Sequence, residues 1–249
     1  QLRHRRLIAS ADRPFGEEIL RRLGAASRPD SRRSSGQLVG EGGVFVGRTA
    51  ELDVLRGALE DVRSGRARTV FVQGESGVGK SALVRHFVDM LPPEALALTG
   101  RCYERESVPY RAVDGIVDAL SGYFVKLSTD RANALLPRRA PLLAQMFPVL
   151  LRVDPIACAP LPQINADPHE RRRQAFGALR ELFARMGDRG LVVVVIDDLQ
   201  WADLDSLQLL EEVLQEPEAP TMLFVGVSRT VPEGPAWIER AISMELKPL

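Results

Sequence analysis

The sequence predicts an α/β protein with a doubly wound parallel sheet, in which about five strands carry helices on both faces. Short apolar runs alternate along the chain with longer amphipathic stretches, as expected when helices join parallel strands. The run at 191–196 is continuously apolar and rich in β-branched residues, which is typical of a strand buried on both faces. A glycine-rich motif at 74–81 also stands between a predicted strand and a predicted helix.

The spacing of apolar residues places the elements in order. Helices are expected at 50–63, 80–91, 110–127, 170–186, 204–215 and 235–242. Strands are expected at 69–73, 96–99, 191–196, 222–228 and 243–246. Between 128 and 169, seven prolines interrupt the pattern, and only helical pieces such as 140–152 can be placed there.

Composition divides the chain into three segments. A short helix is expected at 14–24, where a proline stands at the start and a glycine at the end. Residues 25–43 are rich in serine, arginine and glycine, so we expect a mobile linker. The α/β domain then occupies 44–249.

Bulk properties exclude several classes of protein. Basic and acidic side chains number 33 each, so no charge bias indicates a nucleic-acid partner. The arginines in residues 1–35 fit a solvated segment better than a nucleic-acid-binding arm. No apolar run reaches about 18 residues and no signal peptide is visible, so no membrane partner is expected. Cys102 and Cys158 match no metal or redox spacing, which predicts a reduced, cytoplasmic protein.

Residues 74–81 read Gly-Glu-Ser-Gly-Val-Gly-Lys-Ser, the phosphate-loop pattern G-x-x-x-x-G-K-S. Its glycines allow positive φ, so backbone N–H groups can turn toward an anion, and the next helix adds its positive end. Lys80 is predicted to neutralise the β- and γ-phosphates, and the Ser81 hydroxyl to bind Mg²⁺. The expected nucleotide contacts are Gly74, Glu75, Ser76, Gly77, Val78, Gly79, Lys80, Ser81 and Ala82.

Charged residues follow two further strands, at the end where parallel sheets bind ligands. Asp197 is predicted to hold Mg²⁺, often through water, and Asp198 to orient or deprotonate the attacking water. A helix cap or a turn residue is the alternative for Asp198. Arg229 can stabilise the γ-phosphate, or it can cap the sheet at the surface.

The nucleotide is expected to be ATP with Mg²⁺. The sequence contains no Asn/Thr-Lys-x-Asp motif for reading guanine, which favours ATP over GTP. It contains no Cys/His cluster for zinc, and His86 is expected to be structural.

With these residues in view, the chain resembles the STAND class of signalling ATPases, a group related to AAA proteins. It is most similar to the AAA module of large bacterial regulators with a serine/threonine kinase or LuxR-type output and a helical-repeat sensor. The resemblance covers about residues 44–249. The segment 45–48 with Glu51 matches the opening hhGRExE signature, although Thr49 stands where an acid is usual.

Two more motifs carry this resemblance. Asp197-Asp198 with Trp201 and Asp203 is similar to the family's Walker B pattern, and Arg229 to its sensor arginine. The resemblance implies that Val46 and Arg48 lie near the adenine. It also implies a kinase upstream, a helical-repeat sensor downstream and a nucleotide-dependent oligomer as partners.

Both ends of the chain suggest that it is part of something longer. The family's winged-helix segment is missing, so we expect the domain to be truncated after Leu249. A weaker resemblance, over residues 1–24, is to the C-terminal helix of a protein-kinase domain. No kinase catalytic motif is present, so no protein phosphorylation by this piece is expected.

Two classes of function follow. The first is slow, Mg²⁺-dependent ATP hydrolysis used as a conformational switch in a signalling protein. The second is a nucleotide-dependent scaffold or oligomerisation module with little hydrolysis, or the regulatory part of a LuxR-type regulator. The presence of both aspartates at 197 and 198 favours the first.

Overall fold

The computed structural model describes residues 47–104, 109–161, 167–230 and 235–248. The helix expected at 14–24, the linker expected at 25–43 and Val46 lie outside these residues.

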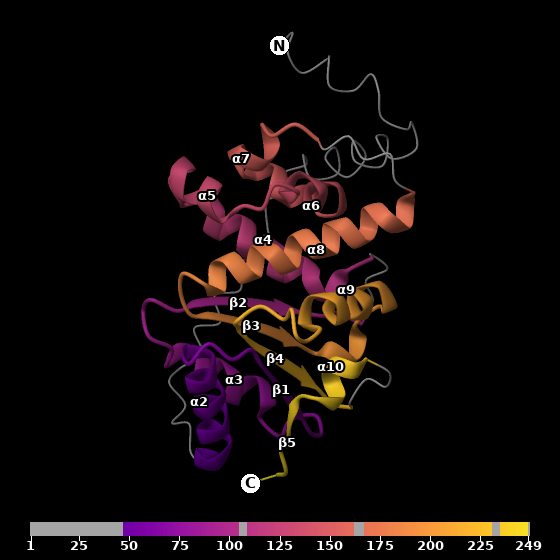
Figure 1. Cartoon of the computed structure of the whole chain (residues 1–249). Coiled ribbons are helices and arrows are strands. Elements are labelled where there is room, and N and C mark those ends of the chain that lie inside the picture. The colour runs from indigo at the N-terminus through magenta and orange to yellow at the C-terminus, as the bar shows by residue number, and fades with distance from the viewer. Residues whose placement is uncertain (1–46, 105–108, 162–166, 231–234, 249) are drawn as a thin grey trace, which may run out of the picture. The chain divides into compact units, whose positions relative to one another are not determined.

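Five parallel strands form the described sheet, which confirms the predicted fold class (Figure 1). They are β1 (Arg68–Gln73), β2 (Leu96–Arg101), β3 (Val192–Asp197), β4 (Leu223–Ser228) and β5 (Ile242–Glu245). Their order is β2-β3-β4-β1-β5, and all neighbours run parallel. β4 therefore lies between β1, which leads into the glycine-rich loop, and β3, which leads into the two aspartates.

Helices cover both faces of the sheet (Figure 1). One face carries α2 (Thr49–Arg63) and α3 (Lys80–Asp89), and the other carries α4 (Arg111–Val125), α8 (Pro168–Gly187), α9 (Leu204–Leu214) and α10 (Ala236–Glu239). The chain crosses the sheet one way from β1 to β2 and returns through β3 and β4. Because crossovers between parallel strands are right-handed as a rule, the change of direction puts the helices on opposite faces.

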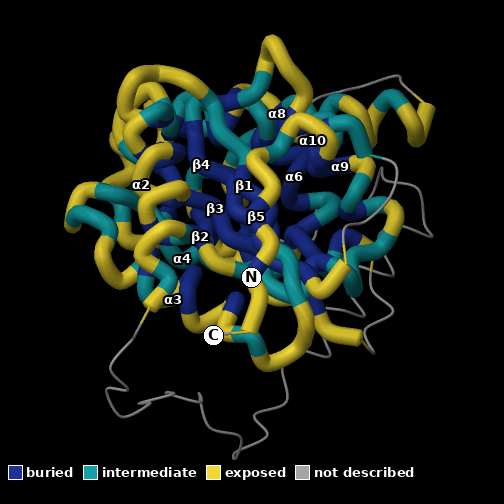
Figure 2. Tube along the Cα trace, turned by 90° about the horizontal axis from the view of Figure 1, so that it is seen from below, coloured by how far each residue is buried: buried dark blue, intermediate teal, exposed yellow. Residues whose placement is uncertain are grey.

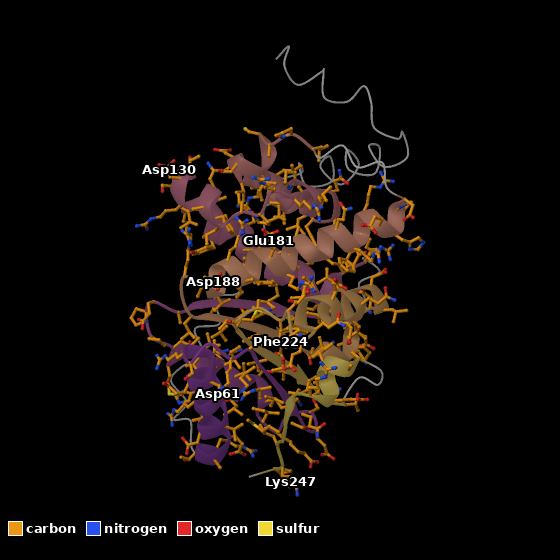
Figure 3. All side chains as sticks on the ribbon, viewed as in Figure 1. Asp61, Asp130, Glu181, Asp188, Phe224 and Lys247 are labelled. Atoms are coloured by element: carbon orange, nitrogen blue, oxygen red, sulfur yellow. The ribbon has the colours of Figure 1, made fainter. Side chains whose placement is uncertain are left out.

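The central strands are buried on both sides (Figure 2). All six residues of β4 are buried, as are the first five of β3. On the α10 side, Phe224 of β4 meets Trp237 edge-on, with 5.3 Å between the ring centroids (Figure 3). The continuous apolar run that predicted β3 thus reflects burial on two faces.

The segment that the sequence left mostly unplaced forms a helical layer outside α4 and α8 (Figure 1). It consists of α5 (Thr129–Leu135), α6 (Ala140–Met146), the 3₁₀ turn η2 (Pro148–Arg152) and α7 (Asp154–Ala157). A proline stands in the first turn of α6, η2 and α7, where its missing N–H needs no partner. The prolines therefore start helices here, and they divide the piece expected at 140–152 at Phe147.

The last helix is shorter than the sequence predicted, and the last strand is displaced by one residue. The helix expected at 235–242 ends at Glu239, and the strand begins at Ile242 rather than at residue 243. Pairing explains the difference, because Ile242 lies opposite Val70 of β1 and belongs to the sheet register. Among the described residues, no helix combines the length and the apolar character needed to cross a bilayer.

One carboxylate joins the segment after β3 to the helix after β2. Asp203 caps α9 by accepting the Ser206 N–H at 2.8 Å, and it also accepts the N–H groups of Tyr110 and Arg111 at 3.2 and 3.0 Å. The Ser206 hydroxyl donates to Asp203 at 2.6 Å and accepts the Ala112 N–H at 3.1 Å. The N-terminus of α4 is thus capped from α9.

Replacing Asp203 by alanine is expected to lower the free energy of unfolding by about 2–4 kcal/mol, because several buried donors lose their acceptor. Burial would raise the pKa of Asp203, but the hydrogen bonds from Ser206, Tyr110 and Arg111 outweigh it, and the pKa is lowered. The stabilisation is therefore present above the unfolded pKa, near 3.8, and lost as the pH falls through the folded value.

Urea unfolding of wild type and variant checks this expectation. The difference in free energy of unfolding between wild type and Asp203→Ala should stay constant from neutral pH down to about 5 and become smaller below about 4. Asp205→Ala is the matched control, because Asp205 lies on the same helix in a half-exposed pair with Arg172 and should cost under about 1 kcal/mol. An equal loss of unfolding free energy in Asp203→Ala and Asp205→Ala would contradict the capping role of Asp203.

Candidate functional site

The glycine-rich loop between β1 and α3 has the backbone that its sequence requires. Gly77 and Gly79 have φ of 87° and 95°, with nothing within 4 Å of an added Cβ, so their conformation and not crowding demands glycine. At Gly74, with φ of 150°, a Cβ would come 2.5 Å from the carbonyl oxygen of Leu246. Gly79 precedes α3 without a side-chain cap, so the first N–H groups of α3 point into the loop.

Lys80 lies under this loop. Its Nζ donates to the carbonyl oxygens of Gly74 at 2.7 Å and Glu75 at 2.8 Å, and the residue is only 8% exposed. Burial lowers the pKa of Lys80, the charge of Arg229 lowers it further, and Asp197 and Asp198 oppose both. The ends of β3 and β4 therefore act electrostatically on the lysine that follows β1.

The other loop positions face outward. Glu75, Ser76, Gly77, Gly79, Ser81 and Ala82 are exposed, and Val78 is half-buried. An anion approaching this edge would meet backbone N–H groups and the Ser81 hydroxyl without any rearrangement of the core.

Asp197 and Asp198 differ in conformation and in partners. Asp197 ends β3, and its Oδ1 accepts the N–H of Asp198 at 2.9 Å. Asp198 has φ of 56°, which is strained for a residue with a side chain. It occupies a turn position, but its side chain caps no helix, since Asp203 caps α9.

Arg101, to which the sequence assigned no role, engages Asp198. It ends β2, and its Nε and Nη2 lie 2.9 and 2.7 Å from Oδ2 of Asp198. Burial would raise the pKa of Asp198, but hydrogen bonds from Arg101 and Gln200 outweigh it and leave the pKa lowered. Strand pairing explains the contact, because Arg101 lies opposite Asp197 in the parallel register.

Gln200 is the second residue that the motifs did not identify. It lies in the 3₁₀ turn η3 (Leu199–Trp201) and bonds both to Asp198 and to the end of β4. Arg229 follows β4, and its side chain is exposed on the same edge as Lys80.

Arg48 contacts the loop itself. Its side chain, only 7% exposed, pairs with Glu51 at 2.9 Å, donates to the carbonyl of Val78 at 3.1 Å and also donates to the carbonyl of Lys247. Lys247 follows β5, as Figure 3 shows. The described contacts of Arg48 thus connect the start of α2, the glycine-rich loop and the segment after β5.

The donors present fit magnesium. Oδ1 of Asp197 accepts the neighbouring N–H, and no donor within the described residues faces its other oxygen. No group of three or more His, Cys, Asp or Glu occurs in the described part of the chain that could cage a metal. One carboxylate and one hydroxyl, completed by phosphate and water, are the donor set that Mg²⁺ takes in nucleotide sites.

A cysteine close to the site carries no chemistry of its own. Cys102 follows Arg101, and its N–H donates to the carbonyl of Asp197 at 2.9 Å. Burial raises the pKa of Cys102 to about 12, so the thiol stays protonated at neutral pH and is a poor nucleophile.

Residues 44–225 match the family described as AAA ATPase domain. Because this match covers more than half of the chain, the protein belongs to that family. Members bind nucleotide and in general hydrolyse ATP.

Two longer proteins are similar in sequence. An uncharacterized protein of Rhizobium meliloti (strain 1021) is 27% identical over 221 residues, and the hybrid signal transduction histidine kinase G of Dictyostelium discoideum is 23% identical over 175. These alignments cover 86% and 68% of this chain. The chain spans only 21% and 5% of the two relatives.

Two solved structures have a similar arrangement of strands and helices. The ORC1 protein of Aeropyrum pernix, in complex with DNA, has a TM-score of 0.46 at 15% identity, over 83% of this chain and 46% of that one. Cdc6p of Pyrobaculum aerophilum has a TM-score of 0.47 at 15% identity, over 81% and 45%.

Arg48→Lys is expected to loosen the glycine-rich loop even without nucleotide, because one ammonium cannot replace a planar guanidinium that bonds three oxygens on separate segments. Amide hydrogen exchange at residues 74–79 should become faster, because the free energy of local opening should fall by about 1–3 kcal/mol. The control is Arg56→Lys, on the same helix, whose pair with Asp53 is exposed. Unchanged exchange in nucleotide-free protein would mean that Arg48 does not hold the loop.

Proposed function

We propose that residues 44–249 bind ATP with Mg²⁺ and hydrolyse it slowly, as a conformational switch in a multidomain bacterial signalling protein. The observation that carries the proposal is the strand order, which puts the C-terminal ends of β1, β4 and β3 side by side, so that the glycine-rich loop with Lys80, Arg229 after β4 and Asp197 at the end of β3 lie at one edge of the sheet. Membership of the AAA ATPase domain family supports nucleotide binding and hydrolysis in general.

Each role follows from the chemistry of the side chain. Lys80 would exchange two neutral carbonyl acceptors for phosphate oxygens, with which its hydrogen bonds are stronger because both partners are charged. Ser81 and Asp197 would hold Mg²⁺, which when bound neutralises charge on the β- and γ-phosphates. Asp198 would accept a proton from the attacking water, and Arg229 would stabilise the γ-phosphate.

A specific contact supports slow turnover. Both hydrogen bonds from Arg101 end on Oδ2 of Asp198, and the amide of Gln200 bonds Oδ1. A carboxylate engaged in this way is a weaker base toward water than a free one, because its charged form is already stabilised. Hydrolysis would therefore require Arg101, which is 58% exposed, to move away.

The same contact keeps a second function open. If Arg101 stays on Asp198 with ATP bound, the domain would act as a nucleotide-dependent scaffold or oligomerisation module with little hydrolysis. Single-turnover hydrolysis of bound ATP separates the two. A first-order loss of ATP that depends on Asp198 supports the switch, and persistence of ATP over hours supports the scaffold.

The domains that adjoin the ATPase domain in the parent protein are also part of the proposal. One relative is a hybrid signal transduction histidine kinase, which supports a role in signalling. We infer that 1–24 belong to the C-terminal helix of a protein kinase, that 25–43 link it to the ATPase domain, and that a helical-repeat sensor follows. A LuxR-type output is the alternative. Adjacent domains of a cytoplasmic parent protein would then be the partners, and nucleotide-dependent oligomers their mode of assembly.

Lys80→Ala is expected to abolish tight ATP binding and to leave the fold largely intact, because the ammonium bonds only carbonyls of an exposed loop. Calorimetric titration with ATP and Mg²⁺ measures the affinity, and thermal unfolding monitors the fold. Lys126→Ala, at an exposed site just after α4, is the control for loss of one positive charge. Equal affinity for ATP in the Lys80 variant and in wild type would contradict the proposal that the glycine-rich loop binds the phosphates.

Asp197→Asn and Asp198→Asn are expected to have different effects. The first should weaken the Mg²⁺ dependence of ATP binding, because an amide is a poorer ligand for a hard cation. The second should preserve binding and lower kcat by about 10²–10⁴-fold, the usual contribution of a positioned base. Binding is measured across a Mg²⁺ titration and turnover by phosphate release. Unchanged hydrolysis in both variants would contradict the placement of the catalytic edge.

A further inference from the structure

Gln200 forms a bridge between the ends of β3 and β4, beyond the last residues, Ile196 and Gly226, at which these two strands pair with each other. Its Nε2 donates to Oδ1 of Asp198 at 3.0 Å. Its Oε1 accepts the N–H of Arg229 at 3.1 Å and the hydroxyl of Ser228 at 3.0 Å. The side chain thus connects the segment after β3 with the end of β4.

The chemistry of the partners fixes the orientation of this amide. A backbone N–H can only donate, so the atom that faces Arg229 must be the oxygen. A carboxylate can only accept, so the atom that faces Asp198 must be the nitrogen. The Ser228 hydroxyl has one proton, and the carbonyl of Thr230 is a second acceptor for it, whereas the Arg229 N–H donates to Oε1 of Gln200. The bridge therefore does not depend on the serine.

Within the described part of the chain, the other side chain that bonds the Asp198 carboxylate approaches it from the solvent side. Arg101 bonds Oδ2, but its side chain is 58% exposed and belongs to an edge strand. Gln200 bonds Oδ1 from a half-buried turn that packs against β4. If Arg101 moves away, Gln200 alone continues to set the orientation of the Asp198 carboxylate.

We propose that Gln200 is a positioning residue that couples the end of β4, where Arg229 meets the γ-phosphate, to the orientation of Asp198. This inference rests on the proposed ATP hydrolysis. A shift of the Arg229 backbone on nucleotide binding would be passed through Oε1 and Nε2 to the carboxylate that faces the attacking water. Because both ends of its amide are bonded to protein groups, Gln200 is expected to act on the chemical step and not on binding.

Only a carboxamide of this length satisfies both ends. Gln200→Glu keeps the size but places a second carboxylate against Asp198 and removes the donor. Gln200→Met keeps the length and the apolar stem but removes both hydrogen bonds. A merely structural role for Gln200 would lower stability in either variant without changing turnover at a temperature well below unfolding.

The experiment compares kcat with the affinity for ATP in the full chain. Both variants are expected to bind ATP and Mg²⁺ within about twofold of wild type and to lose about tenfold or more in kcat, because misplaced catalytic groups are costly in the chemical step. Gln208→Met, at an exposed position on α9, is the matched control and should keep wild-type kcat. Wild-type kcat in the Gln200 variants would overturn the inference.

A double-variant cycle tests the coupling itself. Gln200→Met should reduce kcat clearly less in an Arg229→Ala background than in the parent, because the signal that the bridge transmits is already absent. Equal reductions in both backgrounds would overturn the coupling. Absence of hydrolysis in the wild type would instead contradict the proposed ATPase, so the two failures are distinguishable.

Discussion

Two-sided burial of β1, β3 and β4 is the constraint on which the site depends. These strands have apolar side chains on both faces, so helices must cover both faces and the strands must run parallel. All their C-terminal ends then lie along one edge. Lys80, Asp197 and Arg229, which are distant in sequence, meet there because each follows a buried strand without a long intervening loop.

The glycine-rich loop is held by the protein before any nucleotide arrives. Arg48 bonds the Val78 carbonyl, Lys80 bonds two other loop carbonyls, and the Leu246 N–H donates to Gln73 at 2.8 Å, where β1 ends. Such contacts reduce the entropy that the loop would lose on binding an anion. They also tie the loop to the segment after β5, so that a shift in either one reaches the other.

The sequence was sufficient for the fold and for the position of the glycine-rich loop between β1 and α3, because both are local patterns. The continuous apolar run at 191–196 identified β3, and the spacing G-x-x-x-x-G-K-S identified Lys80. Arg101 and Gln200 could not be found in this way, since their roles depend on which strands lie side by side. No local sequence pattern indicates that β4 lies between β1 and β3 in the sheet. The segment 128–169 could not be placed from its sequence for a different reason, because a proline can both end one helix and begin the next.

In the described site, cationic and anionic side chains partly neutralise one another, and the cations are in excess. Three cations, Lys80, Arg101 and Arg229, stand against two carboxylates, Asp197 and Asp198. Lys80 donates hydrogen bonds to neutral carbonyls, and Arg101 donates to Asp198. Each of these two cations therefore already has acceptors within the protein. In the proposed function, a triphosphate with Mg²⁺ would supply stronger acceptors for the cations and a metal for Asp197. Its binding would then break these internal contacts, and the loop and the end of β2 would change partners together.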